Sequence, residues 1–366
     1  MRLGLVVGTR PEIIKMSPVV RECLQRGVDF FLLHTGQHYS YNLDGLFFEE
    51  LQLPAPDFSL NVGSGSFSQQ LSRMMSGMEE ALTREAPDYV LAEGDTNTVL
   101  AAALVASHLQ IPFVHVEAGL RSYNRQMQEE KNRLIADRVA DVLFPPTVVS
   151  RDILLGEGHD GDRIFVTGNS IVDAVVYYLP IAKQTSSIDT FGLRPQEYFL
   201  ATIHRAENVD CEGVLRQIVA GLAQAAQEHD RPVIFPVHPR TRARIGSFGL
   251  AVPDRIRLIE PVGFYDFLLL ESNAALVLTD SGGVQEECCI LRVPCITLRD
   301  DTERPETLQV GSNVLSGRVP VDLMAHIGRM LARARNWSNP FGDGDAAHRM
   351  VEVLLQSNKG ELLGVN

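Results

Sequence analysis

The fold is decided by residues 275–306, ALVLTDSGGVQEECCILRVPCITLRDDTERPE. The apolar start predicts a buried strand, and Ser281, Gly282 and Gly283 separate it from a predicted helix. A second apolar run, PCITL, predicts the next strand, and two strands joined by a helix lie parallel in one sheet. Paired glycines let backbone N–H groups approach an anion at a helix start. The segment therefore predicts a phosphate-binding turn, although glycines are also common at helix starts that bind nothing.

The two glutamates that follow the glycines suggest what lies beyond the phosphate. Glu286 and Glu287 fall in the first turns of the predicted helix and would repel an anion if they pointed at it. We therefore expect one of them to accept hydrogen bonds from the sugar hydroxyl groups of a nucleotide.

The same alternation of short apolar runs and helical stretches extends through the chain. RLGLVV, VDFFLLH, DYVLA and IPFVHV occur in the first half, and YFLATIH, PVIFPVH and IRLIE in the second, where RIFVTG near the midpoint also reads as a strand. Strands that are apolar throughout indicate parallel sheets covered on both faces. Since 366 residues exceed one typical domain of about 150, we expect two doubly wound, Rossmann-like α/β domains. Their expected limits are residues 1–171 and 172–345, followed by a helix at about 346–366.

Composition excludes several classes of protein. With 45% hydrophobic and 22% charged residues, the chain is typical of globular proteins, and a net charge of −13 without a basic stripe argues against a nucleic-acid partner. Five cysteines without CxxC spacing suit a reducing compartment. No signal peptide and no apolar run of about 18 residues is evident, so we expect a cytoplasmic protein that does not enter a membrane.

Polar side chains follow the predicted strands of the first half. The junction VVGTRPEIIK brings Arg10 and Lys15 to a helix start, where both could reach an anion or simply be solvated. Asp95 follows the next strand, as a reactive carboxylate or as a helix cap, with Thr96 or Asn97 as the alternative caps.

The third junction of the first half concentrates acids and guanidinium groups. Glu117 stands directly at a strand end, and Arg121, Glu129, Glu130 and Arg133 follow within one loop and helix. A salt-bridged helix surface would account for Glu130 and Arg133, whereas Glu117 is harder to explain in that way.

In the second half, His204 ends a strand beside polar neighbours, which favours a functional site over a structural histidine.

Other patterns that match known motifs lack the structural context that those motifs require. GEGHDG, residues 156–161, matches the dinucleotide glycine pattern but follows a helix, so we interpret it as a turn. The ten histidines show no HExxH or Cys/His zinc spacing, and we expect neither a metal nor an organic cofactor.

Nine motifs in order make the chain similar to a known family. They are GTRPEIIKMSPVV, HTGQHYSYNL, EGDTNTVLAA, HVEAGLRS, VTGNSIVDAV, HRAENVD, PVHPRT, TDSGGVQEE and RDDTERPE, and they span residues 1 to about 315. Together they resemble the non-hydrolysing UDP-N-acetylglucosamine 2-epimerases. The resemblance implies a glycosyltransferase-B-type fold, with two domains facing a cleft and the C-terminal helix packing back on the first.

The resemblance also implies an activity in nucleotide-sugar metabolism, of the kind that serves cell-surface polysaccharide biosynthesis. Family members interconvert UDP-N-acetylglucosamine and UDP-N-acetylmannosamine by eliminating UDP to a 2-acetamidoglucal and adding it back. Inversion at carbon 2 needs acid/base groups on two faces of the sugar. The resemblance assigns catalysis to Asp95, Glu117, Glu129 and His204, with Asp95 and Glu117 transferring protons, Glu129 tuning them and His204 contacting the departing diphosphate.

Binding residues follow from the same resemblance. It places the UDP-sugar on Arg10, Lys15, Arg133, Phe267, Ser281, Gly282, Gly283, Glu287 and Arg304, with Glu287 at the ribose and Phe267 near uracil. Some bacterial members bind a second, activating UDP-N-acetylglucosamine, and the matching positions here are Gln37, His38, Arg205 and His238. The family further implies a homodimer.

Three departures from the family pattern concern the substrate. Gln128 replaces the usual proline before the paired glutamates, Arg138 replaces a usual histidine, and Asp301 alters the TTERPE segment. They leave open a 2-epimerase for a modified UDP-2-acetamido sugar, of the 6-deoxy or 3-acetamido uronic type. A catalytically silent UDP-sugar sensor is a further alternative, which the four catalytic positions together disfavour. A hydrolysing epimerase is disfavoured because the GTRPEIIK start matches the non-hydrolysing branch better, and a glycosyltransferase because it would not need the three carboxylates.

Overall fold

The computed structural model describes residues 1–36, 47–185, 188–319 and 321–356. It divides into two compact units, Met1–Ala174 with Phe341–Asn366 and Val175–Pro340. The division falls inside one helix, at Ala174–Val175, whereas the sequence analysis placed it at 171–172. No helix of the described ranges combines the length and the apolar character that a membrane crossing requires.

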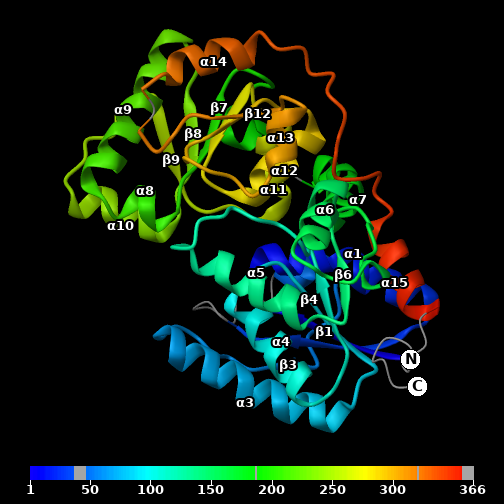
Figure 1. The fold of residues 1–366 in the computed structure, drawn as a ribbon. Helices are drawn as coiled ribbons and strands as arrows, with labels where there is room; N and C mark the ends of the chain where they lie inside the picture. Colours follow the sequence, from blue (N-terminus) through cyan, green and yellow to red (C-terminus); the bar gives the residue numbers. More distant parts are fainter. Residues whose placement is uncertain (37–46, 186–187, 320, 357–366) are drawn as a thin grey trace. The chain divides into compact units, whose positions relative to one another are not determined.

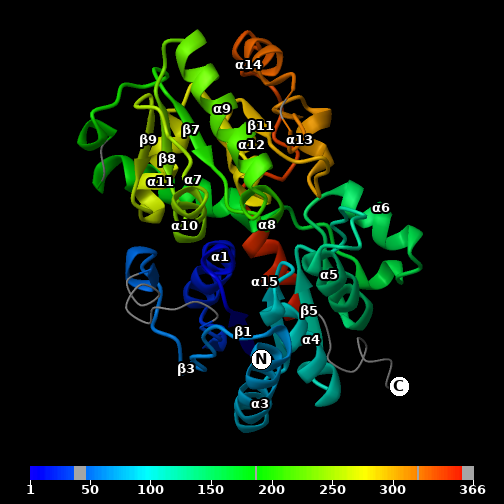
Figure 2. The same ribbon diagram turned by 90° about the vertical axis from the view of Figure 1, so that its left-hand side faces the viewer.

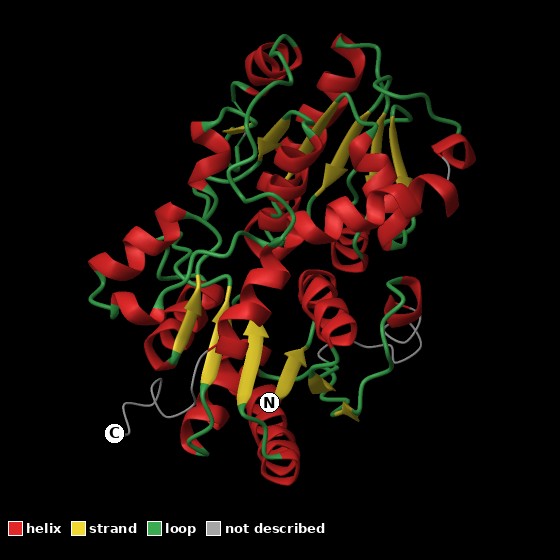
Figure 3. Ribbon diagram, turned by 90° about the vertical axis from the view of Figure 1, so that its right-hand side faces the viewer, coloured by secondary structure: helices red, strands yellow, loops and turns green. Residues whose placement is uncertain are grey.

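Unit 1 is built on a six-stranded parallel sheet of order β3-β2-β1-β4-β5-β6. Figure 3 shows the strands of each sheet in yellow among red helices. The strands are β1 (Arg2–Val7), β2 (Asp29–His34), β3 (Phe58–Ser59), β4 (Tyr89–Glu93), β5 (Phe113–Val116) and β6 (Val142–Phe144). The helices are α1 (Arg10–Arg26), α3 (Phe67–Glu85), α4 (Asn97–His108), α5 (Gln128–Val139), α6 (Val148–Gly156) and α15 (Ala346–Gln356), with a 3₁₀ turn at Gly161–Arg163. Helix α7 (Ser170–Thr185) begins in unit 1 and continues in unit 2 from Val175.

Unit 2 repeats this plan with a parallel sheet of order β12-β11-β10-β7-β8-β9. Its strands are β7 (Phe199–Thr202), β8 (Val233–Pro236), β9 (Ile256–Ile259), β10 (Leu276–Thr279), β11 (Cys295–Thr297) and β12 (Asn313–Leu315). Its helices are α8 (Ala206–Val209), α9 (Glu212–Glu228), α10 (Pro239–Ser247), α11 (Phe264–Ser272), α12 (Gly282–Leu291), α13 (Pro305–Gln309) and α14 (Leu323–Leu331), with a 3₁₀ turn at Ile188–Phe191. Figure 2 shows both units from a second side.

Both sheets therefore have the 3-2-1-4-5-6 order of a doubly wound Rossmann fold. In this order the chain reverses direction across the sheet between the first and fourth strands, and ligands bind beyond the carboxyl ends of the strands there. In unit 1 that point lies between β1 and β4, and in unit 2 between β7 and β10. The predicted doubly wound class is confirmed.

The cores agree with strands that are apolar throughout. Buried side chains of β1, β4 and β5 pack with α3 and α4 in unit 1, and those of β7, β8 and β10 pack with α9 and α14 in unit 2. A second apolar cluster covers the other face of the unit 2 sheet, between that sheet and α11 and α12. Burying each such side chain contributes about 2 kcal/mol of free energy, and this contribution stabilises the packed layers.

The C-terminal helix belongs to unit 1. Figure 1 shows α15, in red, beside α1, in blue. Arg26 reaches Glu352 at 2.6 Å, His348 lies 3.0 Å from Glu22, and Asp173 accepts from the backbone N–H of Ala347 at 2.9 Å. The last residues of the predicted helix, 357–366, lie outside the described residues.

One predicted strand is wrong, and three short strands were not predicted. RIFVTG, residues 163–168, is not a strand: Ile164 makes one isolated parallel bridge to Leu143 of β6, and Phe165 donates to the Leu143 carbonyl at 2.9 Å, but β6 has only three residues and offers no longer ladder. The sequence analysis also missed β3, β6 and β12, which have only two or three residues each and too little apolar pattern to recognise. All three missed strands lie at sheet edges.

Candidate active site

The β1–α1 turn of unit 1 is held close to the sheet at Gly8. A Cβ atom at Gly8 would lie 2.0 Å from Thr98 Oγ1 and 2.6 Å from Thr35 Oγ1, so only glycine fits there. The two threonine hydroxyl groups are hydrogen-bonded to each other at 2.9 Å. This close approach fixes where α1 begins and where its first residues, from Arg10, point.

Glu12 ties that turn to the neighbouring one. Its carboxylate accepts from the backbone N–H groups of Gly8 at 2.5 Å and Thr9 at 2.8 Å, and from the hydroxyl group of Thr96. Burial raises the pKa of Glu12 to about 7, and the nearby charge of Asp95 adds to the shift. One buried carboxyl group thus joins the loop of Arg10 to the loop of Asp95.

Lys15 sits among carboxylates. Its ammonium group, in a side chain only 7% exposed, pairs with Glu117 and lies 3.1 Å from Glu93 Oε1. The side chain of Asn169 also donates to Glu117, at 2.9 Å. Burial raises the pKa of Glu93 well above its usual value although Lys15 opposes the shift, while the charge of Glu117 increases it. The structure therefore places Lys15 as the counter-ion of two acids at the ends of β4 and β5.

Glu117 also has an unusual backbone. Its φ of 68° lies in the left-handed region, which is uncommon for a residue with a side chain. Such conformations cost about 1–3 kcal/mol and persist where surrounding contacts hold them, often at functional sites. The contacts to Lys15 and Asn169 hold this one.

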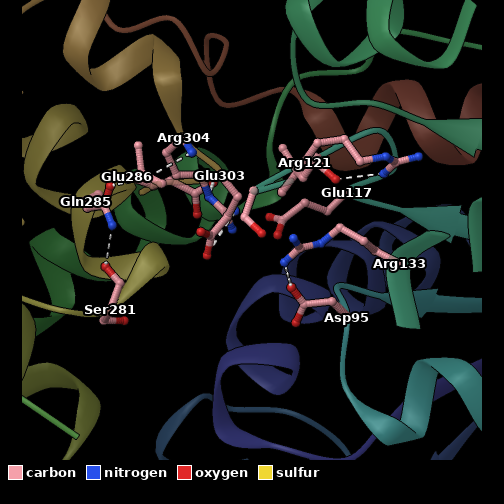
Figure 4. A network of polar contacts seen from close by, with 12 residues as sticks. Asp95, Glu117, Arg121, Arg133, Ser281, Gln285, Glu286, Glu303 and Arg304 are labelled. Carbon is pink, nitrogen blue, oxygen red and sulfur yellow. Dashed lines mark hydrogen bonds and ion pairs between the residues drawn. The ribbon is translucent and has the colours of Figure 1, made fainter. Parts of the chain in front are cut away.

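Asp95 is paired with a buried arginine. Thr96, and not Asp95, caps α4 by accepting from the N–H of Thr98 at 3.1 Å, which leaves the Asp95 side chain for other contacts. It pairs with Arg133 of α5, whose other terminal nitrogen pairs with Glu130 (Figure 4). Asp95 is 26% exposed and Arg133 only 2%. The buried Arg133 thus holds the Asp95 carboxylate in place, while the exposed part of Asp95 is accessible to a ligand.

The two glutamates at the start of α5 have different surroundings. Glu130 is buried and accepts from the backbone of Ser122 at 3.0 Å and of Tyr123 at 2.9 Å, besides pairing with Arg133. A surface salt bridge between Glu130 and Arg133 is therefore the wrong interpretation, since both are buried. Glu129 is exposed on the same turn.

Arg121 supports the loop behind these acids. It pairs with Asp137 at 2.7 Å and with both carboxylate oxygens of Glu157, at 2.9 and 2.5 Å. Asp137 also lies 2.6 Å from His115, and its contacts with His115 and Arg121 lower its pKa although burial opposes ionisation. Arg121 acts as a structural link between β5, α5 and α6.

In unit 2 a buried aspartate organises the switch point. Asp280 is fully buried after β10 and accepts from the backbone N–H groups of His204, at 3.1 Å, and Arg205, at 3.0 Å. The His204 ring nitrogen Nδ1 lies 3.2 Å from the same carboxylate, and the ring is 44% exposed. The side-chain amide of Asn208 also donates a hydrogen bond to the Asp280 carboxylate, at 3.0 Å. Asp280 thus fixes the loop that follows β7.

The start of α12 has the features of an anion-binding turn. Ser281 is its N-cap residue, and the side chain makes no capping hydrogen bond. A Cβ atom at Gly282 would lie 2.9 Å from Glu303 Oε1, whereas one at Gly283 would meet nothing within 4 Å. Gly282 is thus required for close packing and Gly283 faces open space, as expected of a residue against which a ligand can lie.

Charged residues after β11 surround that turn. Arg304 lies 2.6 Å from Glu286, and the buried Arg299 contacts Glu303 at 2.9 Å and Asp301 at 2.8 Å. Figure 4 shows Ser281, Gln285, Glu286, Glu303 and Arg304 together in this unit. Arg205 also reaches Glu303, at 3.3 Å, and donates to the Asp280 backbone at 2.8 Å. Glu286 thus pairs with an arginine of its own unit.

A cavity of about 190 Å³ opens beside this edge. Its lining includes Phe267 of α11, predicted to lie near uracil, as well as His204 and His238. The two histidine rings are 6.2 Å apart. The full lining is Thr202, Ile203, His204, Pro236, His238, Pro261, Val262 and Phe267.

The sequence analysis missed four buried groups that hold these edges together, namely Glu12, Glu93, Asp280 and Glu303. Glu93 and Asp280 lie within the quoted motifs EGDTNTVLAA and TDSGGVQEE at strand ends, which was the available signal. Glu12 and Glu303 looked like ordinary helix and loop acids. The predicted positions Gln37 and His38 lie outside the described residues.

Comparison with known proteins identifies the family. The model of the family described as UDP-N-acetylglucosamine 2-epimerase matches residues 21–355. The chain belongs to this family. The UDP-N-acetylglucosamine 2-epimerase of Methanocaldococcus jannaschii is 49% identical, over 97% of this chain and 99% of the relative. A crystal structure of that organism's epimerase in complex with UDP-GlcNAc and UDP has a TM-score of 0.93, at 49% identity, and covers 98% of this chain and 100% of that one.

Another relative in the family acts on a different sugar. A UDP-2,3-diacetamido-2,3-dideoxy-D-glucuronate 2-epimerase of Pseudomonas aeruginosa is 39% identical, over 97% of this chain and 100% of the relative. The epimerase family resemblance and its two Rossmann-like domains are thus confirmed.

Proposed function

We propose that this chain interconverts UDP-N-acetylglucosamine and UDP-N-acetylmannosamine. Family membership and the relative bound to UDP-GlcNAc and UDP support the proposal. The observation that carries it is the pair of carboxylates Asp95 and Glu117. They follow the neighbouring strands β4 and β5 of unit 1, and each contacts a buried cation. Two acids held in different settings are what a reaction needs when a proton leaves one face of a sugar and returns to the other.

The proposed reaction has two half-steps. A carboxylate removes the proton from carbon 2, the electron pair forms the double bond between carbons 1 and 2, and the bond from carbon 1 to the diphosphate oxygen breaks to release UDP. Protonation of carbon 2 from the opposite face and attack of the diphosphate oxygen on carbon 1 then give the other epimer. We assign proton transfer to Asp95 and Glu117, and the tuning of this pair to Glu129.

The leaving diphosphate carries the charge that develops in this reaction. Positioned N–H donors and cations stabilise such charge. We assign this role to Arg10, to the N–H groups from Ser281 to Gly283, and to His204. The His204 nitrogen Nδ1 faces Asp280, so Nε2 is the atom we assign to the phosphate. Lys15, predicted to bind phosphate, would act here through Glu117, and Arg133 and Arg304 are assigned to the sugar.

The nucleoside is assigned to unit 2. The cavity beside Phe267 has the apolar lining that suits a pyrimidine base, with polar groups from His204 and Thr202 at its edge. Glu287 lies on α12, whose start is the proposed phosphate turn, and is assigned to the ribose hydroxyl groups.

The test is nuclear magnetic resonance of UDP-N-acetylglucosamine with the purified protein in heavy water. We expect UDP-N-acetylmannosamine to form and deuterium to enter carbon 2 in both epimers. Binding of UDP without either change would make the protein a UDP-sugar sensor, and release of free N-acetylmannosamine would make it a hydrolysing epimerase.

A second candidate is 2-epimerisation of a modified UDP-2-acetamido sugar. It is favoured by the relative from Pseudomonas aeruginosa and by the departures at Gln128, Arg138 and Asp301. Asp301 contacts the buried Arg299, and Gln128 donates to Asn132 at 2.9 Å, so two of the three act on segments that carry proposed sugar contacts. A panel of UDP-sugars, compared by kcat/KM, decides between the two substrates.

Three expectations complete the proposal. We expect the protein to be cytoplasmic. We also expect it to form a homodimer, and light scattering of the purified chain tests this oligomeric state. Arg205 and His238, with Gln37 and His38, bind an activating UDP-N-acetylglucosamine. Sigmoidal kinetics that become hyperbolic in the Arg205→Ala variant would support this regulation, and hyperbolic kinetics of the unaltered protein would exclude it.

A further inference from the structure

Unit 2 contains a pair of buried carboxyl groups, of which the proposed function uses only one, Glu287, and gives the other, Glu271, no role. Glu271 of α11 is completely buried, and Glu287 of α12 is 8% exposed. Their carboxyl groups lie within hydrogen-bonding reach of each other. The thiol of Cys288 donates to Glu271 Oε1 at 3.2 Å, while Oε2 is buried and meets no N–H or O–H donor among the described residues.

Two facing carboxylates in such a place cannot both be ionised, because like charges at close range in a buried setting repel strongly. The groups that act on Glu271 are Glu287, Cys288 and Cys295, and Tyr198 lies close enough to respond to its charge. None of these four is a cation. Burial, and next the charge of Glu287, raises the pKa of Glu271 well above its usual value. The pair therefore shares one proton, which the more deeply buried Glu271 holds.

The pair lies directly behind the proposed nucleotide site. Phe267, which lines the cavity, precedes Glu271 by four residues on α11, and Gly283, which faces open space, precedes Glu287 by four on α12. Residues four apart share a helix face. The two helices pack against each other, as Figure 1 also shows. The faces that carry the proposed nucleotide contacts are thus the faces on which the two glutamates lie.

We propose that Glu271 donates its proton to Glu287 as a hydrogen bond and thereby holds Glu287 in the orientation that binds the ribose hydroxyl groups. Glu271 is a positioning residue, since it acts through Glu287. A carboxylate has about four lone-pair positions, so Glu287 can accept this bond and still accept from two hydroxyl groups. The inference rests on the proposed function, which assigns Glu287 to the ribose.

The test compares UDP with 2′,3′-dideoxy-UDP, which lacks both ribose hydroxyl groups. Dissociation constants are measured by titration calorimetry on the full chain and on the variants Glu271→Gln and Glu271→Leu. We expect the unaltered protein to prefer UDP by roughly 10- to 100-fold, the effect of hydrogen bonds to a charged group. Glu271→Gln keeps a donor and should keep this ratio within about threefold, whereas Glu271→Leu, which has none, should reduce it about tenfold or more.

Cys289→Ala is the matched control. It removes a buried side chain from α12, the helix that carries Glu287, so it reports on disturbed packing there, and its preference ratio should equal that of the unaltered protein. An unchanged ratio in Glu271→Leu would overturn the inference while leaving the proposed function intact. If the unaltered protein binds neither nucleotide, the proposed function fails, and this inference fails with it.

A second measurement does not depend on folding of the leucine variant. Infrared spectroscopy detects the carbonyl band of a protonated carboxyl group. We expect the difference between the unaltered protein and Glu271→Gln, at neutral pH, to contain one such band. Its absence would show that Glu271 carries no proton and would overturn the inference.

Discussion

The two sheets share one strand order, but their switch points carry different chemistry. In unit 1 the loops after β1, β4 and β5 bring together Glu12, Glu93, Asp95 and Glu117 with two buried cations. In unit 2 the loop after β10 carries Ser281, Gly282 and Gly283 before α12, and one buried acid, Asp280, holds the neighbouring loop by accepting hydrogen bonds. The fold therefore determines where each site lies, and the loop residues determine the chemistry of that site.

The charge balance also differs between the two edges. In unit 1 burial, and next to it the charge of neighbouring carboxylates, raises the pKa of Glu12 and Glu93, so protons can be held near neutral pH. In unit 2 Glu286 and Glu303 are balanced by arginines, and backbone N–H groups are left at a helix start where anions are favoured. Unit 1 therefore suits proton transfer and unit 2 suits nucleotide binding.

The strongest test of this division is Asp95→Asn. General acid–base catalysis contributes about 10²- to 10⁴-fold, so we expect kcat to fall about 10³-fold and deuterium uptake at carbon 2 to cease. UDP affinity should change less than about threefold if unit 2 binds the nucleotide. The resonance assay measures exchange and calorimetry measures binding; retained exchange would overturn the assignment of Asp95.

Lys15→Met tests whether the unit 1 acids depend on their counter-ion. Removing one partner of a buried ion pair costs about 3–5 kcal/mol, so the free energy of unfolding should fall by that amount. Adding Glu93→Gln should restore part of the loss, since it removes one uncompensated charge. The exposed Lys131→Met is the control and should change stability by less than about 0.5 kcal/mol. Hydrogen exchange should locate the loss in unit 1, and a loss located in unit 2 would contradict the comparison.

Glu12→Gln tests the raised pKa in unit 1. The folded protein holds the Glu12 proton up to about pH 7, whereas the unfolded chain releases it near the ordinary glutamate pKa of 4.5. The stabilisation is therefore present below the unfolded value and is lost as pH rises through the folded one. Relative to Glu12→Gln, the unaltered protein should lose about 3 kcal/mol of unfolding free energy between these values. Denaturant unfolding at several pH values measures the difference, and a difference independent of pH would exclude a titrating Glu12.

The paired variants Gly283→Ala and Gly282→Ala sharpen the assignment of unit 2. A methyl group at Gly283 enters open space, so stability should change by no more than about 1 kcal/mol, while UDP affinity should fall about tenfold because the group occupies the proposed anion position. At Gly282 the methyl group meets Glu303, so stability should fall as well. Calorimetry and denaturant unfolding separate the two effects. Unchanged UDP binding by Gly283→Ala would remove this turn from the proposed site.

Much of the fold and part of the site could be predicted from local sequence. Apolar runs predicted nine of the strands, and the junctions after them predicted Asp95, Glu117, His204 and Ser281. Each of these signals depends on residues adjacent in the chain. RIFVTG failed because apolar, β-branched composition alone cannot show how long its partner strand is, and β6 has only three residues.

What the sequence by itself determined is the class of each segment, the family and the polar residues at the strand ends. Only the tertiary structure decided their partners: that Lys15 serves Glu93 and Glu117, that Glu130 is buried where Glu129 is not, and that Glu271 faces Glu287. The physical reason is that a strand or a cap forms from neighbouring residues, whereas ion pairs and shared protons join segments far apart in the chain. Their energies depend on burial, which exists only after the layers have packed.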